Sequence, residues 1–310
     1  MFDIRDILTT ADQAARQFAV IGARTFLETG VRVEATDAPD DIERLLRERV
    51  YARCHLLDAT AVLDRSVRLA EDVRFVEQIR RKLVGRSYAD GGWKLVADRT
   101  GVVLAEKNGL RLFPRANEIK ELNAGSGQVS VDLPSERRYA IPGFFAYVSI
   151  HGDLDGSRTW RLYVNLRQDS AAAAFLTIID ELENRHVRFQ IKVVNHPERF
   201  TRPDSMTLYV GEADLNSVLK ITHRVLSERF LAGPTPGFSS RLGPGRALAP
   251  ELHATGASTS FGHHCSGIVA ASLLEAHRLG LHDEDARAHH TVRAVRTALA
   301  DAGCPMRWTK

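Results

Sequence analysis

One stretch of sequence decides the fold of this chain: Arg158-Thr-Trp-Arg-Leu-Tyr-Val-Asn-Leu-Arg167. Apolar and polar side chains alternate along it, which is the period of a β-strand. The polar side chains that share one face are Arg161, Tyr163, Asn165 and Arg167. This face is unusually basic for a strand.

The same alternation recurs in Arg188–Val194 and in Met206–Val210, where Lys192 and Tyr209 fall on the polar side. If these strands share a sheet, their polar faces merge into one surface of arginine, lysine, tyrosine and asparagine side chains. Such a surface is costly to desolvate and suits an anionic, phosphorylated ligand.

Composition excludes several classes of protein. The chain has 310 residues, 44% of them hydrophobic, which is enough for two domains or one large one. A net charge of +3 does not call for nucleic acid as a partner. Cys54, Cys265 and Cys304 form no CxxC pair, so we expect neither a disulfide framework nor a thiolate zinc site. Without a long apolar run or a basic-then-apolar leader, we expect a cytoplasmic protein with no membrane partner.

The order of the patterns predicts an α+β fold in three parts. Residues 1–84 are expected to be a helical N-terminal region, with helical spacing through Phe18 and Ile21 and a break at Ala35–Pro39. Residues 85–135 are expected to form a β-meander. Its two hairpin turns are predicted at Thr100-Gly101 and Asn108-Gly109. Residues 136–310 are expected to form an α/β core, in which helices flank a mixed β-sheet.

The core contains a strand–helix–strand pattern. The helix is predicted over Ala171–Arg185, between the strands that carry Arg161 and Lys192. This order indicates a crossover unit with parallel pairing. Further helices are predicted over Leu215–Phe230, over Cys265–Leu279 and over Asp283–Ala302.

Lys192 is the first candidate for chemistry. Arg188 flanks it, and Arg161 or Arg167 lies across from it. Nearby cations and partial burial favour the neutral amine, which a general base requires. The alternative is that Lys192 is solvated on an open sheet face or paired with Asp204.

Two groups of histidines stand near the ends of these elements. The loop after the Lys192 strand carries His196, Arg202 and Asp204, and strand ends often present sites. His263 and His264 precede a predicted helix, a position that suits an anion, so one of them is a candidate acid or phosphate ligand. The spacing of the histidines matches no metal-binding motif, and we expect no metal.

Three other motifs could suggest a function but also have ordinary structural explanations. Gly91-Gly92 lacks the Gly-Lys-Ser/Thr ending of a phosphate loop. Cys265, at a predicted helix start, is either a thiol of lowered pKa or an inert buried cysteine. His289 and His290 are expected to be surface residues.

Several motifs occur in a fixed order. They are Tyr163-Val-Asn-Leu-Arg167, Phe189-Gln-Ile-Lys-Val193, Arg202-Pro-Asp204, Pro234-x-x-Gly-Phe-x-x-Arg-Leu-x-Pro-Gly245 and Ser260-Phe-Gly262. They resemble the Hop-family type III effector domain. They are more similar still to the lyase proteins that share this domain in class V lanthipeptide and thioamitide biosynthesis. The resemblance covers about residues 85–280.

The resemblance implies a phosphothreonine/phosphoserine lyase. A kinase-like partner would phosphorylate a precursor peptide, and the lyase would remove phosphate by β-elimination without a cofactor or metal, leaving dehydroamino acids. Under this hypothesis Lys192 is the base and His264 or His196 is the acid. The residues expected to bind phosphate or position the peptide are Arg161, Arg167, Arg202, Arg241, Tyr163, Asn165, Tyr209 and Asp204.

One position departs from the family pattern. Relatives often carry arginine three residues beyond the glycine of Ser-Phe-Gly, where this chain has Cys265. If that arginine contacts phosphate in the relatives, this protein either binds phosphate in another way or has weakened activity. Two alternatives to the lyase remain open. One is a non-catalytic module that binds a phosphopeptide or leader peptide for a kinase. The other is a secreted effector that acts on a host phosphoprotein.

Overall fold

The computed structural model describes residues 2–35, 41–58, 71–99, 102–121, 127–154, 158–252 and 260–308. A seven-stranded sheet lies at its centre, in the order β10-β11-β13-β14-β12-β16-β15. The strands are β10 (Glu136–Arg137), β11 (Phe144–Val148), β12 (Thr159–Val164), β13 (Phe189–Val194), β14 (Met206–Gly211), β15 (Ser240–Gly243) and β16 (Arg246–Pro250).

The α+β class is confirmed, but the parallel pairing and the mixed sheet are wrong. Every strand pair of this sheet is antiparallel. β12 and β13 do run in the same direction on either side of the helix that connects them. However, β14 lies between them and pairs with both in the opposite direction.

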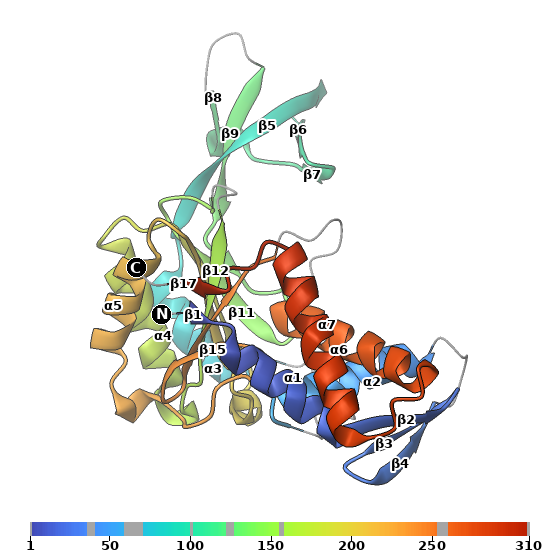
Figure 1. The fold of residues 1–310 in the computed structure, drawn as a ribbon. Helices are drawn as coiled ribbons and strands as arrows, with labels where there is room; N and C mark the ends of the chain where they lie inside the picture. The colour runs from blue at the N-terminus through green and yellow to red at the C-terminus, as the bar shows by residue number, and fades with distance from the viewer. Residues whose placement is uncertain are drawn as a thin grey trace.

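Helices cover the apolar face of this sheet. α4 (Ala171–Glu183) was predicted from its stripe of Phe175, Ile178, Ile179 and Leu182, and all four side chains are fully buried. Phe175 meets Phe145 of β11 edge to face. α5 (Leu215–Val225) and α3 (Val73–Leu83) pack against α4 (Figure 1). α5 ends earlier than predicted, and a 3₁₀ turn over Glu228–Phe230 follows it.

The N-terminal region is not purely helical. α1 (Arg5–Gln17) ends where Phe18 becomes extended, and β2 (Phe18–Gly22), β3 (Thr25–Glu28) and β4 (Val31–Glu34) form an antiparallel sheet. The helix predicted through Phe18 and Ile21 is therefore wrong, because Phe18 and Val20 are buried while Ile21 is half exposed, as in a strand. The break predicted at Ala35–Pro39 falls on residues 36–40, outside the described part.

α2 (Asp41–Val50) continues into a π-helical turn, Tyr51–His55. This turn lies beside α6 (Phe261–Arg278), which α7 (Glu284–Asp301) covers together with α1 (Figure 1). Short strands β1 (Phe2–Asp3) and β17 (Arg307–Trp308) pair and join the two ends of the chain. The N-terminal and C-terminal segments thus form one body.

The predicted meander forms a five-stranded sheet that rises from the body (Figure 1). Its strands are β5 (Ser87–Arg99), β6 (Val102–Lys107), β7 (Leu110–Leu112), β8 (Ile119–Glu121) and β9 (Gln128–Pro134). The turn at Asn108-Gly109 is confirmed, since both residues have the positive φ that a tight hairpin requires. The turn at Thr100-Gly101 lies outside the described residues. Gly91 and Gly92 lie inside β5, at an irregularity in its pairing with β9.

Two details of the C-terminal helices differ from the prediction. α6 begins at Phe261, so His263 and His264 lie in its first turn and do not precede it. His289 is exposed as expected, but His290 is buried, and its Nε2 lies 3.1 Å from Glu275 Oε2. No helix in the described part of the chain is long and apolar enough to cross a bilayer.

Gly237 sets the contact between the N-terminal region and the loop before β15. A Cβ built on Gly237 would lie 1.8 Å from the carbonyl oxygen of Cys54, whereas one on Gly233 would meet nothing within 4 Å. We expect Gly237→Ala to lower the free energy of unfolding by about 2 kcal/mol or more, since backbone must move. Gly233→Ala should change it by less than about 0.5 kcal/mol. Urea unfolding measures both variants, and equal stability would contradict this account of the contact.

Candidate functional site

The candidate site lies on the polar face of the central sheet. Lys192 on β13 is directly opposite Thr207 on β14, and Thr207 is opposite Tyr163 on β12. In the next row on the same face, Tyr209 of β14 lies opposite Arg161 of β12. The polar faces of the three strands therefore merge into one surface. On it, Lys192 lies beside Thr207 and one row away from Arg161.

Two cations share one aromatic ring at the end of this surface. Lys192 Nζ lies 4.4 Å from the centre of the Phe144 ring, and the Arg202 guanidinium carbon lies 5.0 Å from it. Arg202 is held in place by Asp204, with Nε–Oδ1 and Nη2–Oδ2 distances of 2.6 and 2.8 Å. A planar guanidinium fixed in this way presents its remaining N–H groups in a defined direction.

Asp204 is buried and ionised. Burial alone would raise its pKa, but the charge and hydrogen bonds of Arg202, with contributions from His55 and Lys192, lower the pKa of Asp204 to about 2. The carboxylate is therefore negative at every physiological pH. It pairs with Arg202 and lies close enough to Lys192 to interact with its charge.

A second ion pair supports the neighbouring row. Arg161 is only 5% exposed and forms a bidentate ion pair with Glu251. Its guanidinium carbon lies 5.2 Å from the centre of the Tyr209 ring, and Lys192 Nζ lies 5.8 Å from the same ring. Tyr209 thus separates the two cations and contacts both.

The N-terminal region supplies a wall of the site that the sequence analysis missed. The rings of His55 and Tyr51 stack with centres 5.1 Å apart, and Tyr51 stacks on His263 of α6 at 3.6 Å. His55 also meets Tyr163 edge to face at 5.7 Å. The Tyr51 hydroxyl lies beside Arg202 and Ser260. The sequence analysis placed no candidate site residue within residues 1–84.

One signal for this wall was present in the sequence. Tyr51 and His55 are four residues apart at the end of an amphipathic helix, so they lie on one face. The π-helical form of this turn, which often marks functional sites, has no signature in the sequence.

Burial keeps the side chains of this wall uncharged. It lowers the pKa of His55 to about 3, and it lowers that of His263 to about 4 together with the charge of Arg47. Burial raises the pKa of Tyr51 to about 12. Both imidazoles are therefore neutral at pH 7, and the Tyr51 hydroxyl keeps its proton.

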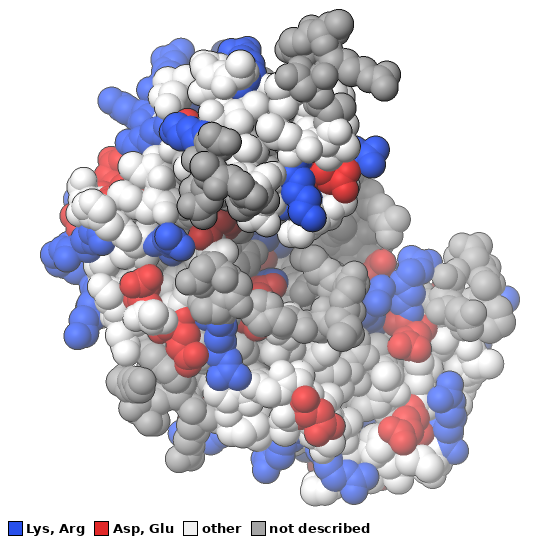
Figure 2. All heavy atoms as spheres, turned by 90° about the horizontal axis from the view of Figure 1, so that it is seen from above, with Lys and Arg blue, Asp and Glu red and all other residues white. Residues whose placement is uncertain are grey.

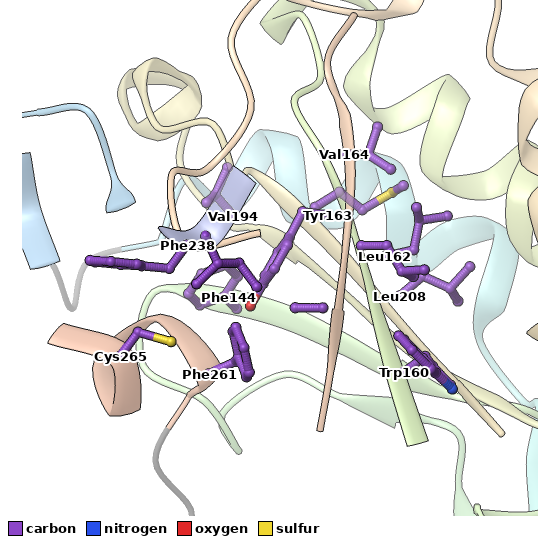
Figure 3. Close-up of a cluster of buried hydrophobic side chains, with 14 of the residues drawn as sticks. Phe144, Trp160, Leu162, Tyr163, Val164, Val194, Leu208, Phe238, Phe261 and Cys265 are labelled. Atoms are coloured by element: carbon purple, nitrogen blue, oxygen red, sulfur yellow. The ribbon is translucent and has the colours of Figure 1, made fainter. Parts of the chain in front are cut away.

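Three buried polar atoms of the site form no hydrogen bond with the described residues: Tyr163 Oη, Thr207 Oγ1 and His55 Nδ1. Figure 3 shows Tyr163 reaching from the sheet toward Phe144 and Phe261, the first residue of α6. Buried polar atoms almost always have partners, so this group is suited to bind polar atoms of a ligand. Two of its members, Tyr163 and Thr207, lie in the same row of the sheet as Lys192.

Arg167, Asn165 and Arg241 lie apart from this cluster. The strand ends at Val164, so the alternation stops there. The Arg167 side chain is 54% exposed and pairs with Asp169 at 3.2 Å. Asn165 Nδ2 donates to the Pro234 carbonyl at 2.9 Å and holds a loop. Arg241 is exposed on β15, four strands away from β13 in the sheet order.

The predicted acids differ in their surroundings. His196 caps a 3₁₀ turn, where its Nδ1 accepts from the Glu198 N–H at 3.3 Å. His264 is half-buried, its Nε2 bonds no described residue, and burial lowers its pKa. Cys265 is fully buried near Phe261 (Figure 3), and burial raises the pKa of its thiol, so the inert interpretation holds.

No group of three or more histidine, cysteine, aspartate or glutamate side chains suited to a metal ion occurs within the described ranges. On the face that Figure 2 shows, basic and acidic side chains of the described residues are interspersed. The ion pairs Arg202–Asp204 and Arg161–Glu251, with Lys192 beside them, make a local charged site in which basic side chains exceed acidic ones by one. Such a site can take one phosphorylated side chain.

Comparisons with known proteins give a matching family model and a solved structure of similar fold. The sequence model of the HopA1 effector protein family matches residues 135–307. An effector protein from Pseudomonas syringae pv. syringae strain 61 has a similar structure, with a TM-score of 0.53 and 14% identity over 98% of this chain and 96% of that chain. An effector protein from Pseudomonas syringae pv. tomato strain DC3000 has a TM-score of 0.38 and 16% identity over 49% of this chain and 58% of that chain. No curated protein matches the chain.

The neutral, buried His55 predicts a pH dependence of stability. Unfolded His55 binds a proton below its ordinary pKa of 6.5, whereas the folded residue stays neutral down to about 3. The unfolded state therefore binds more protons in this window, and stability falls as the pH falls. Between pH 6 and pH 4 we expect His55→Gln to remove a slope of up to about 1.4 kcal/mol per pH unit.

Urea unfolding at several pH values measures this slope. His289→Gln, at an exposed position of α7, is the matched control and should leave the wild-type slope unchanged. An identical pH dependence of wild type and His55→Gln would show that His55 is not buried in its neutral form.

Proposed function

Because this chain belongs to the HopA1 effector protein family, we propose that it is a phosphothreonine/phosphoserine lyase. Its substrate is a precursor peptide phosphorylated by a kinase-like partner, and its product carries dehydrobutyrine or dehydroalanine, as in the biosynthesis of lanthipeptides and thioamitides. The observation that supports this proposal is that Lys192 and Arg202 both lie close to the Phe144 ring, with ionised Asp204 paired to Arg202.

The reaction assigns a task to each of these groups. Once it has released its own proton, the Lys192 amine takes the proton from Cα of the phosphorylated residue. The electron pair of the C–H bond forms the Cα=Cβ double bond, and the Cβ–O bond breaks with its electrons on the phosphate. Arg202 stabilises the charge that develops on the departing oxygen, since its orientation is fixed before the substrate arrives.

The aromatic wall assists the leaving group. Tyr51 keeps its proton at neutral pH and lies beside Arg202, so it can donate a hydrogen bond to a phosphate oxygen there. Among the two predicted acids, His264 has an unpartnered ring nitrogen, whereas Nδ1 of His196 is used to cap its own turn. We therefore retain His264 as the candidate acid, with Tyr51 as the group that orients the phosphate.

One observation favours a non-catalytic phosphopeptide-binding module as the second candidate. Arg161 and Arg202 are each already paired with a carboxylate, and Cys265 is buried where relatives often carry arginine. The site therefore has few unpaired cations to stabilise the additional negative charge that develops as phosphate departs, which is needed for elimination but not for binding alone. Incubation with a synthetic phosphothreonine peptide separates the two functions by mass: the lyase product loses phosphoric acid, whereas a module binds the peptide and leaves its mass unchanged.

The base assignment predicts the effect of Lys192→Ala. We expect the elimination rate to fall by about a hundredfold or more, because the proton acceptor is removed. Affinity for the phosphopeptide should stay within about tenfold of wild type, since Arg202 remains. Mass spectrometry gives the rate and calorimetry the affinity. Lys220→Ala, at an exposed lysine of α5, is the control. Normal turnover by Lys192→Ala would contradict the assignment.

Two arginines test the phosphate site. Arg202→Gln should weaken phosphopeptide binding by about tenfold or more, because charge-assisted hydrogen bonds to phosphate are lost. Arg167→Gln should have the smaller effect, since the Arg167 side chain is exposed and paired with Asp169. An unphosphorylated peptide of the same sequence serves as the control ligand. A larger loss for Arg167→Gln would move the phosphate site to the end of β12.

A further inference from the structure

A cavity of about 320 Å³ lies far from the elimination site, between the N-terminal sheet and the corner where α6 meets α7. Its apolar walls come from β2, β3, α6 and the turn after it. They are formed by Ala19, Val20, Ile21, Leu27, Leu273 and Leu281. Its polar lining consists of His277, His282, Glu284 and Arg287. A volume of this size lies at the lower end of ligand-binding pockets.

Arg287 is the unusual member of this lining. It is only 8% exposed, and no carboxylate among the described residues pairs with it. Its Nε donates to the Ala15 carbonyl at 2.9 Å and one terminal nitrogen donates to the His282 carbonyl at 3.1 Å. The nearest acidic lining residue, Glu284, instead bonds Arg16 at 3.0 Å.

The charge of Arg287 is therefore buried without a counter-ion. Neutral carbonyls satisfy some of its N–H groups but do not balance its charge, and an unpaired buried charge is costly. A second polar group of the lining is also unpartnered, because the buried Nδ1 of His277 bonds no described residue. The unpartnered imidazole nitrogen indicates a polar ligand, and the buried arginine indicates that this ligand carries a negative group.

We propose that this cavity binds a small carboxylate with an apolar body. The fork of a guanidinium matches a carboxylate in geometry. A single arginine among apolar walls suits one negative charge and leaves too few donors for a phosphate dianion. The apolar part of the ligand packs against the side chains of β2 and α6, as in other small-molecule sites.

The site is separate from the elimination site. Its α6 residue His277 lies fourteen residues beyond His263, and at the rise of an α-helix this is about 20 Å along the axis. Its occupancy does not depend on the chemistry at Lys192. Binding at the cavity can therefore be tested independently of the proposed lyase activity.

Calorimetric titration of the full-length protein with sodium hexanoate tests the proposal. Hexanol and hexylamine are the matched probes, with the same apolar body and a neutral or positive head. We expect hexanoate to bind at least about tenfold more tightly than either, because only the carboxylate forms charge-assisted hydrogen bonds with Arg287. Binding of hexanoate no tighter than that of hexanol would overturn the proposal.

Two variants locate the binding. Arg287→Gln should weaken hexanoate binding by at least about tenfold, and Arg293→Gln, at an exposed position of the same helix, should leave it unchanged. Because loss of Arg287 also removes two bonds to carbonyls, Leu281→Phe provides a variant that fills the cavity and keeps the arginine. It should weaken binding as well. Hexanoate affinity unaffected by Leu281→Phe would place the binding elsewhere and contradict the proposal.

The carboxylate has two possible sources, a free acid or an acidic side chain of a peptide. A short peptide with glutamate between leucines, and its glutamine counterpart, distinguish them. Competition between hexanoate and the glutamate peptide alone would identify a peptide side chain. Binding of hexanoate without competition by either peptide would identify a free acid. The absence of binding by both hexanoate and the glutamate peptide would show that the cavity holds no carboxylate.

Discussion

The ion pair between Arg202 and Asp204 is the interaction on which the rest of the site depends. A carboxylate that is both buried and ionised must be surrounded by positive charge and hydrogen-bond donors. Lys192 and Arg202 both lie within about 5 Å of the centre of the Phe144 ring, and Tyr51 lies beside the guanidinium. Removal of Asp204 would leave two cations close together without a counter-ion. The pair thus fixes the geometry in which a phosphate could be held.

The site extends beyond the segment that matches the family model. That segment begins at residue 135 and contains Lys192, Arg202 and Asp204, but Tyr51 and His55 precede it. The π-helical turn that carries them is locked against α6, because Gly262 leaves no room for a side chain beside the His55 ring. An N-terminal region in which the sequence analysis placed no candidate residue is thereby part of the wall of the site.

The sequence was sufficient for the parts of the fold that depend on local pattern. Alternation placed Arg161, Tyr163 and Lys192 on one polar face, and helical periodicity identified α4. Sequence patterns did not predict the features of the fold that depend on contacts between distant segments. Period-two spacing continued to Arg167, but β12 ends at Val164. Strand–helix–strand order predicted adjacent parallel strands, but β14 lies between them. The stacking of Tyr51 on His263 joins residues more than two hundred positions apart, and no local pattern reports such a contact.

Removal of a Cα proton by Lys192 is the central claim of this account, and isotope labelling tests it most directly. A phosphothreonine peptide deuterated at Cα is incubated with the protein, and the product is weighed. The account predicts loss of phosphoric acid together with the deuterium, at a rate below that of the protonated peptide if proton transfer limits the reaction. A product that gains a hydroxyl and keeps its deuterium would identify phosphate hydrolysis, and a peptide of unchanged mass would identify binding alone. Either result would contradict the elimination mechanism.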